Sequence, residues 1–342
     1  MLHLTTFFDK NYLSRGLVLY NSLKEYNSDF ELYILCLDDF TKDFFEKHKT
    51  DFPEVKTLQL VEIEKNDSQL AIAKSNRSRI EYYFTLSPCL PLYLLKKYNL
   101  PHICSLDADI LFLSSPKPLF DKLNDFSIVI TPHKFSKEIL HLSRYGTYNV
   151  SFQIFKKNET GLSCLQKWKK ECIEFCGDEF DELNDRFADQ KYLDKWITLY
   201  PNEVFVLNDN VSGLAPWNLN NYKIEKKENH YFSNDEKMIF YHFHHFKIFD
   251  SSWASNGFNV YKAKHQKGVD YLYSDYWNII DTFNNQLAIV KEDSTRYKTS
   301  DKLWPKLLKE KVVYKRKNNK VEHKSFTFVP KFIRKFIIKR YA

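Results

Sequence analysis

Two carboxylates stand one residue apart inside an apolar stretch of the sequence, "HICSLDADILFLSSP", residues 102–116. Side chains two residues apart in a strand point the same way, so Asp107 and Asp109 would present both carboxylates to one spot. Two hard oxygen ligands suit Mg²⁺ or Mn²⁺, and these cations in turn suit phosphate oxygens. Apolar residues on both sides are not typical of a solvated strand end. The stretch therefore predicts a metal-bound diphosphate, although a bare Asp-x-Asp pair often occurs by coincidence.

Strands and helices alternate along the chain and would position this pair. Apolar stretches predict strands at 2–8, 31–38, 56–63, 102–113, 126–133, 148–157 and 238–249. Helical spacing predicts helices at 12–26, at 161–176, and at 79–98 with an interruption near Pro88 and Pro91. This alternation predicts an α/β fold with an open, mostly parallel sheet covered by helices on both faces. Such sheets bind ligands at the carboxyl ends of their strands.

The composition describes a globular chain with a large core. It has 342 residues, of which 43% are hydrophobic and 17% aromatic, and only 7 are glycine. The six cysteines are scattered among apolar neighbours and are predicted to be reduced core thiols rather than a disulfide or a zinc site. The first residues do not resemble a secretory signal, and no apolar run reaches the ~20 residues that span a bilayer. We therefore expect a cytoplasmic protein that is not integral to a membrane.

Positive charge is concentrated at the carboxyl end of the chain. Residues 301–342 hold 14 Lys or Arg and 3 acidic residues, whereas the first 300 residues hold 37 basic and 41 acidic ones. Within 325–342, Phe332, Ile333, Phe336 and Ile337 form an apolar helical stripe among basic residues, which predicts a helix on an anionic membrane surface. The alternative is a helix that packs on its own domain, and no motif favours nucleic-acid binding. We predict one α/β body, 1–265, with a helical basic extension, 266–342.

Five stretches, in order, resemble the sugar-nucleotide glycosyltransferases of the GT-A fold, and among them the bacterial retaining enzymes of the family 8 type. They are "FDKNYL" (8–13), "LDADILFL" (106–113), "YNVSFQIFKKN" (148–158), "FADQKYLDKW" (187–196) and "IFYHFHHFK" (239–247). Together they cover residues 1 to about 250 and are more specific than any one motif. The stretches "SRIEYYFT" and "APWNL" resemble a closer bacterial group of uncharacterised transferases placed in surface-polysaccharide assembly.

The resemblance assigns the first stretch to the nucleotide. It implies that Asp9 accepts a hydrogen bond from a uracil ring and that Tyr12 stacks beneath that ring. Thr6 and Phe7, which directly precede this loop, are placed at the nucleotide as well. The alternative for Asp9 is a turn or a helix N-cap.

By the same resemblance, Asp107 and Asp109 bind the metal, with His242 as the third ligand. The run "HFHH" leaves His244 and His245 open as alternative ligands. Lys247 would lie near the diphosphate, but the family's glycine after the His-Phe pair and its Lys-Pro-Trp ending are missing here.

Further residues are assigned to the donor and the acceptor. Arg77 and Arg79 are candidates to neutralise phosphate or contact the donor sugar, with a solvated helix start as the alternative. The resemblance places Asp189 on the sugar hydroxyls and Gln190 at the reacting face, whereas Asp189 could instead favour a helix dipole. The sugar or acceptor pocket would be lined by Asn149, Trp217 and Asn218.

The resulting hypothesis is a metal-dependent glycosyltransferase. It would move a sugar from a nucleoside-diphosphate donor, with UDP as the expected nucleotide, to a cell-surface glycan or a lipid-linked acceptor, with retention. Bound Mn²⁺ or Mg²⁺ would stabilise the charge on the leaving diphosphate as a Lewis acid. The alternatives are a nucleotidyltransferase that makes a nucleotide sugar, although its Gly-rich phosphate loop is absent, and a non-catalytic protein that binds a sugar nucleotide or glycan.

Overall fold

A computed structural model describes residues 1–249, 251–286, 312–317 and 320–325 of the chain. Its centre is a seven-stranded sheet in the order β3-β2-β1-β4-β7-β6-β8. Four of the six strand pairings are parallel, and β7 is antiparallel to both of its neighbours. This agrees with the predicted α/β fold and its mostly parallel sheet.

The seven strands of the central sheet are β1 (Leu2–Phe8), β2 (Phe30–Cys36), β3 (Val55–Gln59), β4 (His102–Leu106), β6 (Ile128–Pro132), β7 (Tyr148–Lys156) and β8 (Val204–Val206). The shorter strands are β5 (Ile110–Phe112), β9 (Ile224–Lys227), β10 (His230–Ser233), β11 (Glu236–Lys237), β12 (Phe240–His242), β13 (Lys247–Ile248), β14 (Trp253–Ser255), β15 (Val312–Lys317) and β16 (Lys320–Ser325).

The α-helices are α1 (Leu13–Tyr26), α2 (Asp39–Lys47), α3 (Leu60–Lys65), α4 (Ser68–Ser75), α5 (Arg79–Lys97), α6 (Lys117–Phe120), α7 (Glu159–Glu174), α8 (Trp196–Leu199), α9 (Phe258–Tyr261) and α10 (Lys267–Gln286). The 3₁₀ helices are η1 (Lys10–Tyr12), η2 (Asp121–Asn124), η3 (Lys137–Tyr145), η4 (Lys191–Lys195) and η5 (Leu219–Asn221).

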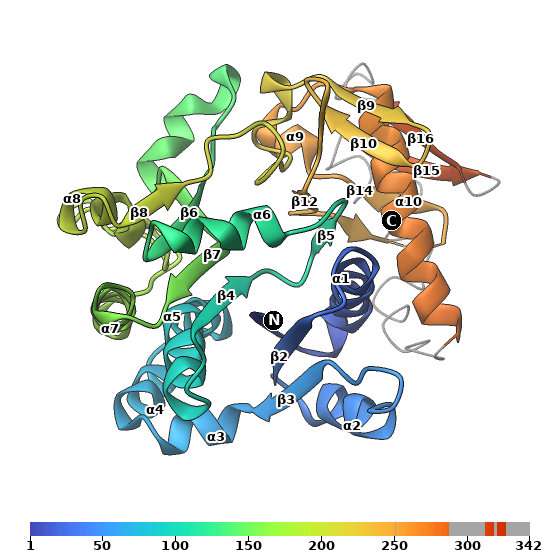
Figure 1. Cartoon of the computed structure of the whole chain (residues 1–342). Coiled ribbons are helices and arrows are strands. Elements are labelled where there is room, and N and C mark those ends of the chain that lie inside the picture. The colour runs from blue at the N-terminus through green and yellow to red at the C-terminus, as the bar shows by residue number, and fades with distance from the viewer. Residues whose placement is uncertain (250, 287–311, 318–319, 326–342) are drawn as a thin grey trace, which may run out of the picture.

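Each face of the central sheet has its own hydrophobic core, because successive side chains of a strand point to opposite faces. On β2, Leu32 and Ile34 pack with α1, α2 and α6, whereas Tyr33 and Leu35 pack with α3, α4, α5, α7 and α8. Figure 1 shows α1 and α5 flanking β4 from opposite sides. Both faces are therefore covered by helices, as predicted.

Helix α5 corrects the expected interruption near Pro88 and Pro91, because it runs through both prolines. Its start is fixed by a capping box in which the Glu81 carboxylate accepts from the Ser78 N–H at 2.8 Å. Leu86 and Leu90 are fully buried, so packing against the sheet offsets the two backbone donors that proline lacks.

Three predicted strands are shorter than expected. The strand at 56–63 ends at Gln59, where the Glu62 carboxylate accepts from the Gln59 N–H and starts α3. The strand at 102–113 breaks into β4 and β5 around a turn at 107–109. The strand at 238–249 breaks into β12 and β13, with His245 at a φ of 61° between them. The start of a helix at the first break, and a turn at the other two, therefore interrupt the predicted strands.

The described part of the predicted extension packs into the body of the chain. Helix α10 contributes to a third core with residues of α1, β5 and β12, and the β15-β16 hairpin adds to β13 and β14 in a four-stranded sheet. The expectation of a purely helical extension is corrected by this hairpin. The proposed membrane segment 325–342 lies, except for Ser325, outside the described residues.

Two further expectations concern cysteines and the membrane. All six cysteines are buried and free, as predicted. Among the described helices, none combines the length and the apolar character that crossing a bilayer requires.

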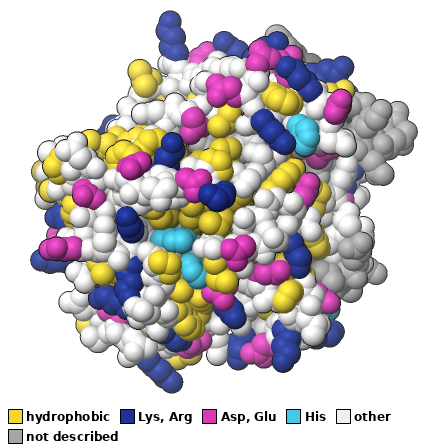
Figure 2. Space-filling model, in the orientation of Figure 1, with side chains coloured by type: hydrophobic (Ala, Val, Ile, Leu, Met, Phe, Trp, Pro, Cys, Tyr) yellow, Lys and Arg dark blue, Asp and Glu magenta, His cyan; other side chains and the backbone are white. Residues whose placement is uncertain are grey.

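On the face shown in Figure 2, basic and acidic side chains are interspersed.

Candidate active site

The acidic pair lies at the carboxyl end of β4, in the turn that leads to β5. Strand β12 pairs with β5 so that His242 stands opposite Ile110, directly beside Asp109. His242 Nε2 lies 3.0 Å from Asp109 Oδ1 and 3.3 Å from Asp107 Oδ2. Each of the three side chains offers one ligand atom within 4.8 Å of the others. A turn, rather than the extended strand we expected, brings the two carboxylates together.

The three side chains are strongly coupled electrostatically. Burial would raise the pKa of Asp109, but the charge and hydrogen bond of His242 outweigh it and lower that pKa to about 2. Burial would lower the pKa of His242, but Asp109 and Asp107 raise it. Two carboxylates and one imidazole form a donor set that fits Mn²⁺ or Mg²⁺, because both cations accept oxygen ligands and Mn²⁺ also accepts imidazole.

The cluster lies in a cleft of about 660 Å³. Seven of the predicted residues line it: Phe7, Asp107, Asn149, Asp189, Gln190, Trp217 and His242. They meet because β4 ends where the antiparallel β7 begins, so Asn149 lies at the same edge of the sheet as Asp107. The structure thus joins six segments that are widely separated in the sequence.

Asp189 and Gln190 reach the cleft from the segment that joins α7 to η4. Asp189 is 2% exposed, its Oδ2 accepts from Ser87 Oγ at 2.5 Å, and its backbone carbonyl accepts from Trp168 Nε1 at 2.8 Å. Burial raises the pKa of Asp189 to about 7. Gln190 Nε2 donates to the Tyr145 carbonyl at 2.9 Å. Both side chains are therefore held by defined partners at the cleft wall, and neither begins a regular α-helix.

Asn149 and Trp217 line other parts of the cleft. Asn149 Oδ1 accepts from the Ser151 N–H at 3.0 Å, and its Nδ2 has no partner among the described residues. The Trp217 ring meets the rings of His242 and His244 edge to face, at 5.4 and 5.1 Å. The Trp217 ring therefore packs against the His242 ring. His244 and His245 are not part of the carboxylate cluster.

The loop predicted to bind the nucleotide lies at the carboxyl end of β1, next to that of β4. Asp9 Oδ1 accepts from the Asn11 N–H at 2.9 Å and caps η1, which is the alternative role considered from the sequence. Tyr12 is 44% exposed, and the charge of Asp109 raises its pKa to about 12. Thr6 is buried within β1 and does not line the cleft.

Four further predicted residues do not line the cleft. Arg77 donates to the carbonyls of Cys172, at 2.7 Å, and Ile173, at 2.6 Å, so it caps the end of α7. Asn218 is fully buried and bonds the His133 and Gly213 carbonyls and the Ala215 N–H. Arg79 and Lys247 are exposed outside the residues that line the cleft.

The sequence did not point to several residues of the cleft. Ser87 holds Asp189 across 102 positions of sequence, and His133 stacks on Phe135 at 4.4 Å. Burial lowers the pKa of His133 to about 3, which keeps the imidazole neutral. Tyr83 and Tyr145 also line the cleft. Tyr83 lies in the stretch "SRIEYYFT", which gave it no role, and no motif marks the others, because only tertiary contacts bring these side chains to the site.

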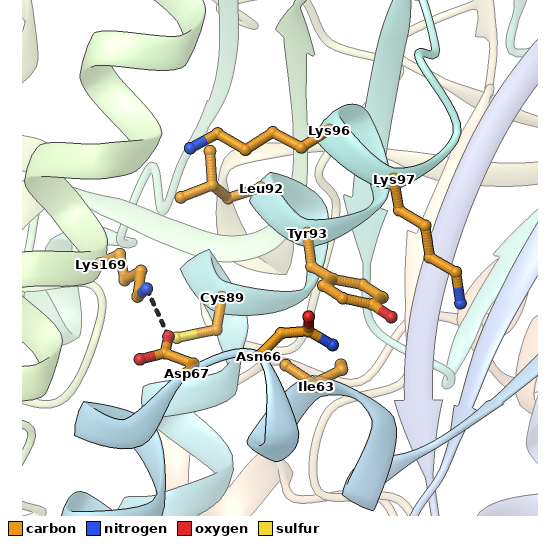
Figure 3. A pocket seen from close by; sticks show the side chains of 9 residues that line it. All are labelled: Ile63, Asn66, Asp67, Cys89, Leu92, Tyr93, Lys96, Lys97 and Lys169. Atoms are coloured by element: carbon orange, nitrogen blue, oxygen red, sulfur yellow. Dashed lines mark ion pairs between the residues drawn. The ribbon is translucent and has the colours of Figure 1, made fainter.

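A second cavity, of about 540 Å³, lies between α3, α5 and α7 (Figure 3). Lys169 forms an ion pair with Asp67 there, and Lys96 and Lys97 line its rim. None of the predicted site residues lines this cavity.

Comparison with solved structures identifies the class of fold. The galactosyltransferase LgtC, crystallised with donor and acceptor sugar analogues, matches 82% of this chain and 96% of its own with a TM-score of 0.51 at 13% identity. The chain therefore has a glycosyltransferase-like GT-A fold, with a candidate metal site at its Asp-x-Asp pair.

Two proteins of Bacillus subtilis are similar in sequence. The uncharacterised protein YfnD is 28% identical over 281 residues, covering 80% of this chain and 87% of YfnD. The uncharacterised protein YfnF is 30% identical over 253 residues, covering 71% of this chain and 81% of YfnF. The chain belongs to the same family as YfnF. No protein-family model matches the chain.

Proposed function

We propose that this chain is a metal-dependent glycosyltransferase that moves a sugar from a nucleoside-diphosphate donor, with UDP as nucleotide, to a surface glycan or a lipid-linked acceptor. The observation that carries the proposal is the convergence of Asp107, Asp109 and His242 at the carboxyl edge of a GT-A sheet. A cleft beside this cluster has room for a nucleotide sugar.

Each part of the site has a role in this proposal. Asp107, Asp109 and His242 would hold Mn²⁺ or Mg²⁺, which when bound stabilises the charge that grows on the leaving diphosphate. Tyr12 offers an exposed ring for the base, and Phe7 lines the adjoining wall. Asn149 Nδ2 is available as a donor to sugar hydroxyls.

The remaining steps concern the acceptor. Asp189 would orient the sugar, and Gln190 would lie at the reacting face. With retention, the acceptor oxygen takes the face that the diphosphate leaves, so donor and acceptor share one side of the cleft. Trp217 and Tyr261, which both line it, offer aromatic surface for an acceptor sugar.

The test is Mn²⁺-dependent hydrolysis of a panel of nucleotide sugars by the full chain. We expect wild type to hydrolyse at least one UDP-sugar, and Asp109→Asn to lose about 10- to 100-fold in rate because the cluster loses one anionic ligand. Asp43→Asn, on the exposed surface of α2, is the matched control and should equal wild type.

Metal binding provides a second readout that does not depend on finding the sugar. Mn²⁺ at 100 times its Kd should stabilise wild type by about 2.7 kcal/mol and leave Asp109→Asn unchanged. Equal stabilisation of both proteins, or activity that persists after chelation, would contradict the proposed metal site. Formation of a nucleotide sugar and pyrophosphate from a nucleoside triphosphate and a sugar 1-phosphate would favour the nucleotidyltransferase alternative.

The proposed membrane contact is tested separately. The full chain should sediment with anionic liposomes, and the chain without residues 325–342 should not. Sedimentation of both would refute that role for the segment.

A further inference from the structure

The second cavity is separate from the cleft, because the two share no lining residue. Part of its wall is apolar, formed by the buried side chains of Ile63, Cys89 and Leu92 and by the half-buried ring of Tyr93. Its volume of about 540 Å³ falls in the range of roughly 300–1,000 Å³ that is typical of pockets for small organic molecules. The cavity therefore has both the room and the apolar surface for an organic group.

The charged side chains of this cavity are three lysines, Lys96, Lys97 and Lys169, and one aspartate, Asp67. Both oxygens of Asp67 are engaged, because Oδ2 pairs with Lys169 and Oδ1 accepts from the Leu70 N–H at 3.3 Å. An ammonium group has three N–H donors, so Lys169 keeps donors for a ligand after this pairing. The exposed Lys96 forms no ion pair with any described residue. The cavity thus has an excess of positive charge and of hydrogen-bond donors.

The three lysines differ in their surroundings. Lys97 Nζ lies 3.1 Å from Glu62 Oε2 and 5.2 Å from the centre of the Tyr93 ring. Figure 3 shows Lys97 on one side of Tyr93 and both Lys96 and Lys169 on the other. Lys96 belongs to α5 and Lys169 to α7. An anion on that side of the cavity would therefore have a donor on each of two helices.

These two helices are fixed to each other by hydrogen bonds. Arg77, two residues before α5, donates to two carbonyls in the last turn of α7. Ser87 of α5 and Trp168 of α7 both bond Asp189, at 2.5 and 2.8 Å. The walls that carry the lysines are therefore formed before any ligand arrives, so binding costs little ordering of the protein.

We propose that the second cavity binds a small organic phosphate, a phosphate monoester whose organic part is apolar or aromatic. The phosphate oxygens accept from Lys96 and Lys169, and the organic part lies against Leu92 and Tyr93. A phosphate monoester carries a charge of about −1.5 to −2 and three terminal oxygens, so it can serve both ammonium groups. A carboxylate carries a single charge, which Asp67 already supplies to Lys169.

Calorimetric titration of the full chain tests the proposal, with metal ions removed and no sugar nucleotide present. The probes are phenyl phosphate, benzoate, inorganic phosphate and phenol, which separate the phosphate group from the aromatic ring. Phenyl phosphate should bind at least about fivefold more tightly than each of the other three, because it alone offers both groups. The proposal is overturned if phenyl phosphate does not bind, or if any of the other probes binds equally well.

A matched pair of variants locates the binding. Lys96→Gln should weaken the binding of phenyl phosphate by at least about fivefold, because a charged donor is lost. Lys170→Gln makes the same change of charge on α7, at an exposed residue that does not line the cavity, and should bind like wild type. Equal affinities of the two variants would overturn the assignment to this cavity. Both lysines are exposed, so neither substitution should move the urea midpoint.

These measurements are independent of the proposed sugar transfer, since they need neither a metal nor a donor. A negative result with phenyl phosphate refutes the second site alone. A failure to hydrolyse any UDP-sugar refutes the proposed transfer and leaves the second site in place.

Discussion

The buried carboxyl of Asp189 is expected to make the stability of this protein fall as pH rises from about 4 to about 7. Burial raises its pKa from 3.8 to about 7 in the folded state, and the unfolded chain keeps the ordinary value. Between these values the folded state holds a proton that the unfolded state has lost. Folding therefore takes up a proton in this window, and the resulting stability is lost as pH rises through it.

The size of the effect follows from the two pKa values. The separation of about three pH units corresponds to about 4 kcal/mol in the free energy of unfolding over the whole window. Between pH 5 and pH 8 the expected loss is about 3 kcal/mol. Asp189 is 2% exposed, so solvent screening does not reduce this figure much.

Urea unfolding of wild type and Asp189→Asn at pH 5 and pH 8, with a chelator present, measures this contribution. The asparagine variant carries no titrating group there, so its stability relative to wild type should increase by about 3 kcal/mol from pH 5 to pH 8. Other titrating groups affect both proteins and cancel in the difference. Asp125→Asn, at an exposed position, controls for the loss of one negative charge.

A difference between wild type and Asp189→Asn that is the same at both pH values would refute the reasoning. It would mean that Ser87 and the cleft stabilise the ionised carboxylate as well as water does. A difference that changes in the opposite direction would show that another group governs the pH dependence, because a pKa of Asp189 at or below its ordinary value of 3.8 gives no change between pH 5 and pH 8.

Further predictions concern residues that hold the walls of the cleft. Arg77→Ala should lower the free energy of unfolding by about 2–3 kcal/mol, because it leaves two carbonyls of α7 without their charged donor; an unchanged urea midpoint would contradict this. Asn218→Ala should cost a similar amount, since two carbonyls and one N–H lose their partner, and thermal unfolding would show it. Gly213→Ala should lower the melting temperature, because Gly213 has a φ of 70° and an added Cβ would lie 2.5 Å from Thr131 Cγ2; a neutral effect would show that this loop relaxes freely.

The order of strands and helices could be predicted from the sequence, because it depends on local patterns. The apolar stretches of β1 and β2, and the helical spacing of α1, are properties of neighbours within a few residues. The antiparallel direction of β7 could not be predicted from the sequence, because strand direction depends on how distant segments pack. The continuity of α5 through Pro88 and Pro91 was missed for the same reason, since tertiary packing outweighs the local cost of proline.

Some residues of the candidate site could likewise be predicted from the sequence, and others could not. Asp107 and Asp109 were found because they interrupt an apolar stretch, and the resemblance to a known family suggested His242, Asp189 and Asn149. Arg77 was assigned to phosphate on its charge alone, and the structure gives that charge to the end of α7.

By itself, the sequence determined that this chain forms an α/β sheet covered by helices on both faces, with a pair of acids after a core strand, because periodicity and residue type are local properties. Only the tertiary structure decided that a turn brings the two acids together, that His242 rather than His244 lies beside them, and that Ser87 holds Asp189. The relations of His242 to the two acids and of Ser87 to Asp189 join residues that are more than 100 positions apart, and their distances follow from packing across the whole sheet.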